Sequence, residues 1–277
     1  MTTNPKTLLD HFEIDPKKSL GQNFLHDPNA LEKIVASAEL MPDDVVVEIG
    51  PGTGTLTELL ARAAKKVYSI EIDERLRPIL AMQLASHKNV ALVFEDVQEV
   101  NIPALVERQP FVVVANIPYY ITSAIIRQLL ESDHRPRRIV MTVQLELAER
   151  MAARPGDLSL MAVSVQFYGK PQIVARFNPA VFWPRPDVAS AVIRIDTYEK
   201  PPVDVPDEKT FFKVVRAGFS QKRKQLRNAI AGGLAIKSEA ATALLERAGI
   251  DPSRRAETLT LDEWAALARV YAAENAD

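Results

Sequence analysis

The residues best suited to chemistry in this chain are Asn116, Ile117, Pro118 and Tyr119, which follow a short run of apolar and β-branched residues. The run over 111–115 predicts a buried parallel strand, and the proline ends it because proline has no backbone N–H to donate. An amide, a backbone carbonyl and an aromatic ring therefore come together at a strand end. These groups bind and orient ligands, and ligands of open α/β sheets bind at this end of the strands.

Three alternating glycines follow a second apolar run, which contains Glu48. Glycine lets the chain turn sharply and lets a ligand approach the backbone without interference from a Cβ atom. The dinucleotide-binding fingerprint requires a further glycine where this chain has Thr55. The pattern of Gly50, Gly52 and Gly54 instead resembles motif I of S-adenosylmethionine-dependent methyltransferases. A tight strand-to-helix turn without a ligand is the alternative.

Acidic residues follow the next two predicted strands. Glu71 ends the run that starts at residue 66, and Asp96 follows the run over 90–94. A carboxylate at the first position can accept hydrogen bonds from both hydroxyls of a ribose, and one at the second can accept from an adenine amino group. Each carboxylate alone is more typical of a solvated loop or a helix cap. Together with the glycines and Asn116, they predict one sheet edge that holds an adenosyl cofactor.

The alternation of strands and helices predicts an α/β fold followed by a smaller C-terminal all-α domain. The resemblance to motif I implies that its sheet is a Rossmann-like S-adenosylmethionine-dependent methyltransferase sheet. Two late strands are expected over 159–168 and 188–195, the second at an edge of the sheet. The clearest break in composition is the proline-rich stretch over 201–207, which we interpret as a linker. We therefore expect an N-terminal arm plus methyltransferase domain over 1–200 and a helical domain over 201–277.

Two later segments carry groups suited to contacts with a nucleic acid. Four positive charges lie close together in a predicted helix, on Lys222, Arg223, Lys224 and Arg227. Contact with phosphates is one explanation for them, and a solvated helix face is the other. Phe182 lies in a loop rich in proline and aromatic residues. This loop either contacts a nucleic acid or is only a rigid connection at the surface.

The composition limits the possible functions. The chain of 277 residues, 25% charged and 47% apolar, is typical of a globular protein with one large and one smaller domain. Because it has no cysteine, disulfides and thiolate metal sites are excluded, and we expect no metal. We find neither a signal peptide nor a membrane-spanning run, so we expect a cytoplasmic protein with no membrane partner. At a net charge of −2, nucleic-acid binding would have to depend on local basic patches.

Several motifs occur in a specific order along almost the whole chain. They are LGQNFL at 20–25, EIGPGTG at 48–54, EID at 71–73, Asp96, NIPYYIT at 116–122, FWPRPDVAS at 182–190, FSQKRKQLR at 219–227 and RAETL at 255–259. This set resembles the ribosomal small-subunit RNA adenine-N6 dimethyltransferases. The chain departs from residues common in that family at Ala124, Asp187 and Ala189, of which the last two lie in a predicted RNA-facing loop.

The resemblance implies transfer of methyl groups from S-adenosylmethionine to the N6 amino groups of two adjacent adenosines in small-subunit ribosomal RNA. The product would be N6,N6-dimethyladenosine, and the enzyme would act in small-subunit biogenesis on a pre-ribosomal particle, as a monomer. The 201–277 domain would bind RNA through its basic segment. The residues that would bind the methyl donor are Asn23, Leu25, Gly50, Gly52, Glu71, Asp96 and Asn116.

The implied reaction assigns a role to each residue of the central motif. An adenine amino group is a poor nucleophile because its lone pair is delocalised into the ring. The Asn116 side-chain oxygen and the backbone carbonyl of Ile117 or Pro118 would hold its N–H groups and aim the lone pair at the sulfonium methyl group. Tyr119 would stack on a base extruded from the RNA, with Phe182 on its second face. No general base is required, because the methylated amine can lose its proton to solvent.

Two other interpretations remain open. Large-subunit ribosomal RNA methyltransferases that confer macrolide resistance share the fold and the Asn-Ile-Pro-Tyr sequence, although the residues at 120–122 and the near-neutral charge favour the small-subunit enzymes. DNA adenine and protein glutamine methyltransferases usually carry proline after the asparagine, and they fit less well. A noncatalytic ribosome-assembly or nucleic-acid-binding factor on the same fold is the alternative from another class. The intact cofactor edge argues against it.

Overall fold

The computed structural model describes residues 4–221 and 223–275. Lys222, one of the predicted RNA-binding residues, lies outside the described residues. Within the two described ranges, no helix combines the length and the apolar character needed to cross a membrane.

The chain divides into two compact units, each built from two segments. The first unit consists of Met1–Ala148 with Lys170–Thr197, and the second of Glu149–Gly169 with Tyr198–Asp277. The segment between the two parts of the first unit therefore packs with the C-terminal helices.

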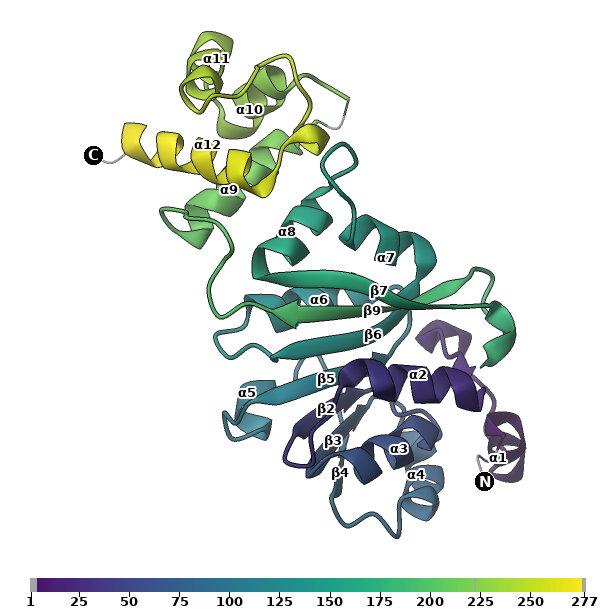
Figure 1. Cartoon of the computed structure of the whole chain (residues 1–277). Coiled ribbons are helices and arrows are strands. Elements are labelled where there is room, and N and C mark those ends of the chain that lie inside the picture. Colours follow the sequence, from purple (N-terminus) through teal and green to yellow (C-terminus); the bar gives the residue numbers. More distant parts are fainter. Residues whose placement is uncertain (1–3, 222, 276–277) are drawn as a thin grey trace. The chain divides into compact units, whose positions relative to one another are not determined.

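A seven-stranded sheet forms the centre of the first unit (Figure 1). Its strands are β2 (Val45–Ile49), β3 (Lys66–Glu71), β4 (Val90–Phe94), β5 (Phe111–Asn116), β6 (Arg138–Gln144), β7 (Gly169–Phe177) and β9 (Ser190–Thr197). They lie in the order β4-β3-β2-β5-β6-β9-β7. The first five strands are parallel, and β9 is antiparallel to β6. A separate two-stranded ladder joins β1 (Phe24–Leu25) to β8 (Phe182–Trp183).

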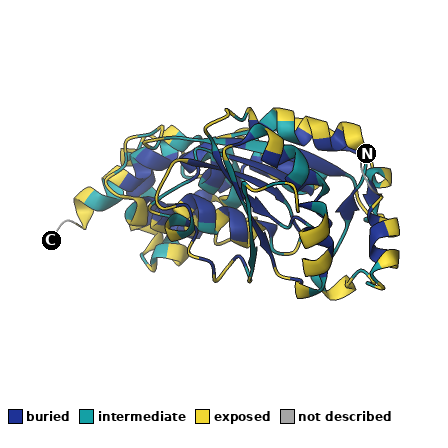
Figure 2. Ribbon diagram, turned by 90° about the horizontal axis from the view of Figure 1, so that it is seen from below, coloured by how far each residue is buried: buried dark blue, intermediate teal, exposed yellow. Residues whose placement is uncertain are grey.

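Helices cover the central strands, as a parallel sheet requires. Figure 2 shows the strands buried and the outer faces of the helices exposed. Apolar side chains of α2 and α3 pack with Val46 and Val112 of the sheet. The helical segments of this unit are α1 (Pro5–His11), η1 (Lys18–Leu20), α2 (Pro28–Ala38), α3 (Thr55–Ala63), η2 (Glu74–Leu76), α4 (Arg77–Gln83), α5 (Ile102–Leu105), α6 (Thr122–Glu131) and η3 (Pro179–Val181), while α7 (Leu145–Met151) crosses the unit boundary.

The strand order reverses between β2 and β5, and this reversal determines where a ligand can bind. From β2 the chain proceeds outward through α3 to β3, and from β5 it proceeds in the opposite direction through α6 to β6. Because such crossovers are right-handed, α3 and α6 lie on opposite faces, which leaves a crevice at the carboxyl ends of β2 and β5. Ile49 lies opposite Ala115, so Gly50 and Asn116 are neighbours at this crevice.

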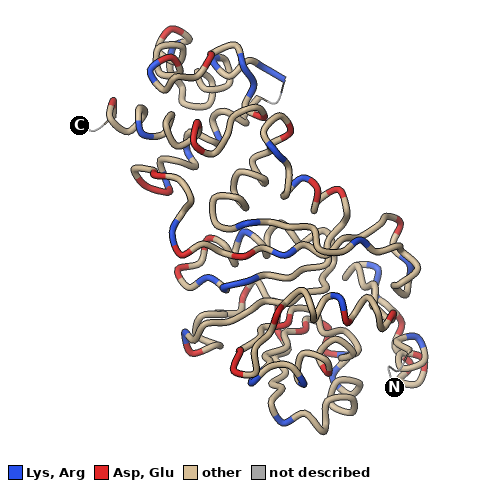
Figure 3. The backbone as a smooth tube through the Cα atoms, in the orientation of Figure 1, with Lys and Arg blue, Asp and Glu red and all other residues tan. Residues whose placement is uncertain are grey.

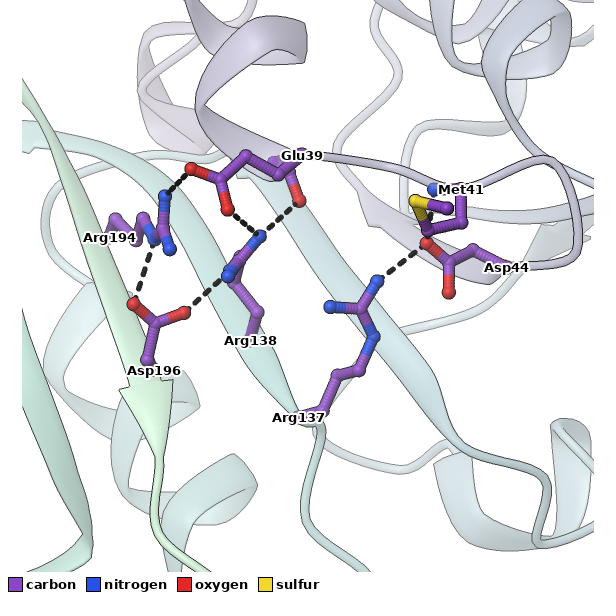
Figure 4. Close-up of polar contacts among 8 residues, drawn as sticks. Glu39, Met41, Asp44, Arg137, Arg138, Arg194 and Asp196 are labelled. Atoms are coloured by element: carbon purple, nitrogen blue, oxygen red, sulfur yellow. Dashed lines mark hydrogen bonds and ion pairs between the residues drawn. The ribbon is translucent and has the colours of Figure 1, made fainter.

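Ion pairs at the other end of β6 fasten α2 to the sheet (Figure 4). Arg138 pairs with Glu39, the C-cap of α2, at 2.9 Å and with Asp196 of β9 at 2.5 Å. Arg194 pairs with the same two carboxylates. The two arginine side chains are largely buried and share both carboxylates, which holds them in one geometry, so this network supports the sheet and lies away from the crevice.

The second unit is helical. It contains α8 (Leu160–Tyr168), α9 (Glu208–Gly218), α10 (Leu226–Leu234), α11 (Ser238–Arg247), η4 (Ala256–Thr258) and α12 (Leu261–Glu274). Phe167 of α8 stacks on Phe211 of α9, with ring centroids 4.5 Å apart. Trp264 of α12 is fully buried and tilts against Phe219 at 5.5 Å. An aromatic core therefore joins α8 to the C-terminal helices.

The predicted α/β sheet and the helical C-terminal region are confirmed, but two predictions about late strands are wrong. The run 159–168 is not a strand, because Ser159 caps helix α8 by accepting a hydrogen bond from the Ala162 backbone. The run 188–195 does form a strand, β9, but β9 does not lie at the edge, because β7 pairs with its outer side.

Candidate active site

A cavity of about 260 Å³ lies at the carboxyl ends of the central parallel strands. Every residue predicted to bind the methyl donor or to act in catalysis lines this cavity. They come from the strand ends, from the turns after them, and from the β1–β8 ladder. The fold thus brings together groups that the sequence separates by more than 150 residues.

Gly50 forms the floor of the cavity at the point where the strand order reverses. Its φ angle of +75° lies in the left-handed region, which side chains rarely adopt. A Cβ atom on Gly50 would lie 3.0 Å from the Asn116 carbonyl oxygen and 3.3 Å from Cγ2 of Ile117. Glycine is therefore required here both by the turn and by the close approach of the Asn116–Tyr119 motif.

Glu71 ends β3 with its side chain buried and fixed. Its two carboxylate oxygens accept hydrogen bonds from the backbone N–H of Gly52 at 3.2 Å and of Asp73 at 2.9 Å. Burial raises the pKa of this carboxyl to about 7, against the effect of these hydrogen bonds. The side chain is thus held in one orientation beside the glycine turn, where it can accept hydrogen bonds from a ligand.

Asp96 and Asn23 each retain an unused acceptor at the cavity. One carboxylate oxygen of Asp96 accepts a hydrogen bond from the Gln98 backbone at 2.9 Å. The side-chain amide of Asn23 donates to the Gly21 carbonyl at 3.0 Å. Among the described residues, neither the second Asp96 oxygen nor the Asn23 side-chain oxygen has a hydrogen-bond donor. Leu25 adds an apolar wall.

The structure distinguishes between the two carbonyls considered for the central motif. The Pro118 carbonyl accepts hydrogen bonds at 3.3 Å from the Ile121 backbone and from the Thr122 hydroxyl, both near the start of α6. In the described part of the chain, the Asn116 side chain and the Ile117 carbonyl have no such partner. Asn116 and Ile117 are therefore the acceptors available to a ligand.

The two aromatic residues are held firmly. The Tyr119 hydroxyl lies 2.6 Å from the hydroxyl of Ser190, which is fully buried on β9. Burial raises the pKa of Tyr119, so its hydroxyl stays neutral and can donate. Phe182 is only 2% exposed and lies opposite Leu25 in the β1–β8 ladder. Ser190 belongs to the motif over 182–190, but the sequence does not predict it as a site residue, because its contact with Tyr119 spans 71 positions.

Glu48 is a second buried carboxyl beside the site. It lies within β2, two residues before Gly50, and is fully buried. The Ser69 hydroxyl donates to one of its oxygens at 2.7 Å, while the other has no partner within the described residues. Burial raises the pKa of Glu48 to about 7.

Replacing Glu48 by glutamine is expected to flatten the pH dependence of stability. The pKa of the Glu48 carboxyl is about 7 in the folded state and has its ordinary value of 4.5 in the unfolded state. Between pH 4.5 and 7 the folded state therefore binds more protons than the unfolded state. Stability contributed by this group is therefore lost as pH rises from about 5 to 8. The glutamine amide does not titrate, so the variant lacks this pH-dependent contribution to the free energy of unfolding, which amounts to at most about 3 kcal/mol. Denaturant titrations at pH 5 and pH 8 test this; identical pH dependence in both proteins would contradict it.

The described basic residues predicted to bind RNA lie in the second unit. Arg223, Lys224 and Arg227 are all exposed. The helix predicted across this segment is wrong in part, because α10 begins only at Leu226 and the residues before it form a turn. Figure 3 shows positive positions on this turn and on the start of α10. The turn presents Arg223 and Lys224 to solvent and the first helical turn of α10 presents Arg227, as either phosphate contact or a solvated face requires.

The chain is similar to known proteins along almost its whole length. The profile of the family "Ribosomal RNA adenine dimethylase" matches residues 14–273. The "Ribosomal RNA small subunit methyltransferase A" of Dehalococcoides mccartyi is 41% identical over 268 residues, which cover 96% of this chain and 92% of the relative. The protein of the same name from Geobacillus thermodenitrificans is 45% identical over 272 residues, covering 95% and 93%.

Among solved structures, the 23S rRNA methyltransferase ErmE is similar with a TM-score of 0.73 at 30% identity, covering 90% of this chain and 99% of that one. The predicted methyltransferase sheet with C-terminal helices is thereby confirmed. Motifs, fold and full-length similarity agree. The chain belongs to the ribosomal RNA adenine dimethylase family.

Proposed function

We propose that this enzyme transfers methyl groups from S-adenosyl-L-methionine to the N6 amino groups of two adjacent adenosines in small-subunit ribosomal RNA. The product is N6,N6-dimethyladenosine, and the modification belongs to small-subunit biogenesis in the cytoplasm. The observation that carries the proposal is that the predicted cofactor residues and the Asn116–Tyr119 motif line one and the same cavity. The small-subunit relatives, 41% and 45% identical to this chain, support the choice of substrate.

The residues at the strand ends fit S-adenosylmethionine. Gly50 lines the cavity without a side chain, and a Cβ atom there would press on the Asn116 carbonyl oxygen at 3.0 Å. Glu71 offers a fixed pair of carboxylate oxygens for ribose hydroxyls, and Asp96 offers an unused acceptor for the adenine amino group. Leu25 and Asn23 complete the binding surface. The bound donor supplies an electrophilic methyl group on its sulfonium.

The work of the central motif is to position the target amine. Asn116 and Ile117 both line the cavity, and within the described residues neither the Asn116 side-chain oxygen nor the Ile117 carbonyl has a hydrogen-bond partner, so together they can hold both N–H groups of an adenine. This arrangement favours a tetrahedral nitrogen whose lone pair points at the reacting carbon. Tyr119, anchored through Ser190, and Phe182 offer aromatic faces for the extruded base. A second round on the same nitrogen requires that the pocket accept a monomethylated base.

The large-subunit alternative is tested by substrate choice. ErmE, named as acting on 23S rRNA, shares the fold at 30% identity, whereas the small-subunit relatives share 41% and 45%. Unmethylated small and large subunits should be incubated separately with labelled S-adenosylmethionine. We expect label in the small subunit only. Label confined to the large subunit would overturn the assignment, and binding of labelled donor without any transfer would favour a noncatalytic assembly factor.

The helical C-terminal domain is proposed to bind the RNA through its basic segment. Replacing Arg223 and Lys224 by alanine is expected to weaken RNA binding and to lower the slope of log Kd against log salt by about 1.5, because two phosphate contacts are lost. Filter binding at several salt concentrations measures both quantities. The matched control replaces the exposed Lys209 and Lys237 of the same unit. Equal slopes for the two double variants would mean that Arg223 and Lys224 are merely solvated.

A further inference from the structure

A buried carboxylate outside the predicted site organises one wall of the cavity. Asp73 is only 3% exposed and follows Glu71 by two residues. Gln22 donates its side-chain amide to Asp73 at 2.8 Å, and Arg75 forms an ion pair with it at 2.6 Å. Burial acts to raise the pKa of Asp73, but the hydrogen bonds from Arg75 and Gln22 outweigh it and hold the pKa below its ordinary value. Asp73 is therefore charged at neutral pH.

The same network holds the N-terminal arm at two further points. Arg75 also donates to the backbone carbonyl of Asp15 at 3.1 Å. The side-chain oxygen of Gln22 accepts a hydrogen bond from the Lys17 backbone at 2.8 Å. The arm segment, residues 15–23, is thus tied to the end of β3 at both its start and its end. These two hydrogen bonds span 51 and 60 positions of the sequence.

The arm segment and the strand after it also pack on the other two parts of the site. A Cβ atom on Gly21, whose φ is +56°, would lie 3.0 Å from Cβ of Pro118 in the central motif. A Cβ atom on Gly52 would lie 3.0 Å from the Phe24 ring. The arm therefore touches the glycine turn, the acidic strand end and the central motif, and Gln22 itself lines the cavity.

The backbone of Asp73 links this wall to the proposed methyl-donor site. Its N–H donates to Glu71 at 2.9 Å while its carboxylate holds Gln22. Asn23, proposed to contact the donor, follows Gln22 directly, and Leu25 lies three positions after Gln22. Opening of the contact between Gln22 and Asp73 would therefore loosen the stretch of chain that carries both residues to the cavity.

We propose that Gln22 is a positioning residue that latches the arm segment onto Asp73, so that Asn23 and Leu25 are already in place when S-adenosylmethionine binds. The choice of S-adenosylmethionine as the ligand rests on the proposed function, whereas the latch, which is the hydrogen bond from Gln22 to Asp73, does not depend on it. Gln22 does not touch the reacting atoms in this account. Its loss should therefore weaken donor binding much more than it slows transfer at saturating donor.

The experiment compares two variants of opposite design in the full-length protein. Gln22→Ala removes the side chain, while Gln22→Glu keeps its shape but places a carboxylate against Asp73. A hydrogen-bonded latch predicts that both variants bind S-adenosylmethionine at least about tenfold more weakly, with Gln22→Glu no better than Gln22→Ala. The rate at saturating donor should stay within about twofold of the parent rate. A residue that only fills space would leave Gln22→Glu close to the parent protein.

A second readout needs no methyl donor. Lys17 and Lys18 are exposed trypsin sites within the arm segment. Opening of the latch should speed cleavage there about fivefold or more in both variants, because cleavage follows the open population. The matched control is Gln172→Ala, which removes an exposed glutamine from β7 and should leave cleavage unchanged. Unchanged cleavage and donor affinity in the Gln22 variants would overturn the proposal. Faster cleavage of the Gln22 variants, together with a parent protein that binds no donor, would instead contradict the proposed function alone.

Discussion

Replacing Asn116 by alanine is expected to lower the rate of methyl transfer by about 10²–10³-fold, the usual cost of removing one preorganised hydrogen-bonding group from a reacting centre. The Asn116 side chain lines the cavity and has no hydrogen-bond partner within the described residues. Without its oxygen, the target amine loses one of the two acceptors that orient its lone pair. Single-turnover assays at saturating S-adenosylmethionine, with unmethylated small subunits, measure this effect.

The loss of activity should not reflect loss of the fold. Because the Asn116 amide makes no contact that the fold requires, the free energy of unfolding should change by less than about 1 kcal/mol. The matched control is Asn29→Ala, which removes the same amide from an exposed position on α2. Turnover by Asn116→Ala above a tenth of the parent rate would contradict the proposed role of its side chain.

Replacing Gly50 by alanine is expected to impair donor binding and methyl transfer together. The new Cβ atom would lie 3.0 Å from the Asn116 carbonyl oxygen, so the motif that binds the target base must move. The backbone at φ +75° adds strain of about 1–2 kcal/mol. We expect donor affinity and single-turnover rate each to fall at least about tenfold, because a small displacement of a positioned group is costly in rate.

The Gly249→Ala variant separates the effect of the backbone strain from the effect of the clash with the central motif. Gly249 has almost the same backbone angle, φ +73°, but a Cβ atom there would meet nothing within 4 Å. The Gly249→Ala variant should therefore have a lower free energy of unfolding because of the strain, but the same affinity for the donor as the parent protein. Isothermal titration with S-adenosylmethionine and denaturant unfolding measure both quantities. Equal donor affinity for Gly50→Ala and the parent protein would mean that the turn tolerates a side chain.

The sequence could predict the cavity because its parts lie at strand ends. Buried parallel strands read as short valine-rich runs, and the residue types just after them are visible in the chain: glycines, Glu71, Asp96 and Asn116. Since parallel strands end at one edge, placing them in one sheet was sufficient to bring these groups together. The order of the strands was not needed for that step.

The two wrong predictions about the late strands, over 159–168 and at the edge position of 188–195, have identifiable physical causes. The run 159–168 has apolar residues on every side because helix α8 is buried within the second unit, so neither helical nor strand periodicity is visible. The cap residue Ser159 was the signal that could have identified it. Strand β7 alternates between exposed and half-buried residues and begins Gly-Lys-Pro-Gln, which is typical of a loop. Without β7, the strand β9 was placed at the edge.

Contacts between distant side chains could not be predicted. Nothing in the local sequence pairs Tyr119 with Ser190 or Gln22 with Asp73, since each contact depends on how separate elements pack. These contacts nevertheless decide how firmly the predicted residues are held. The types of the functional groups were therefore accessible from the sequence, whereas the side chains that orient them required the structure.

The most direct test of the account is to map the methylated bases. Unmethylated small ribosomal subunits are incubated with the protein and S-adenosylmethionine, and the RNA is digested and analysed by mass spectrometry. The account predicts N6,N6-dimethyladenosine at two adjacent adenosines with the parent protein, and unmodified adenosine at both with Asn116→Ala. Absence of dimethyladenosine with the parent protein, or its formation by Asn116→Ala at more than a tenth of the parent rate, would contradict the proposed mechanism.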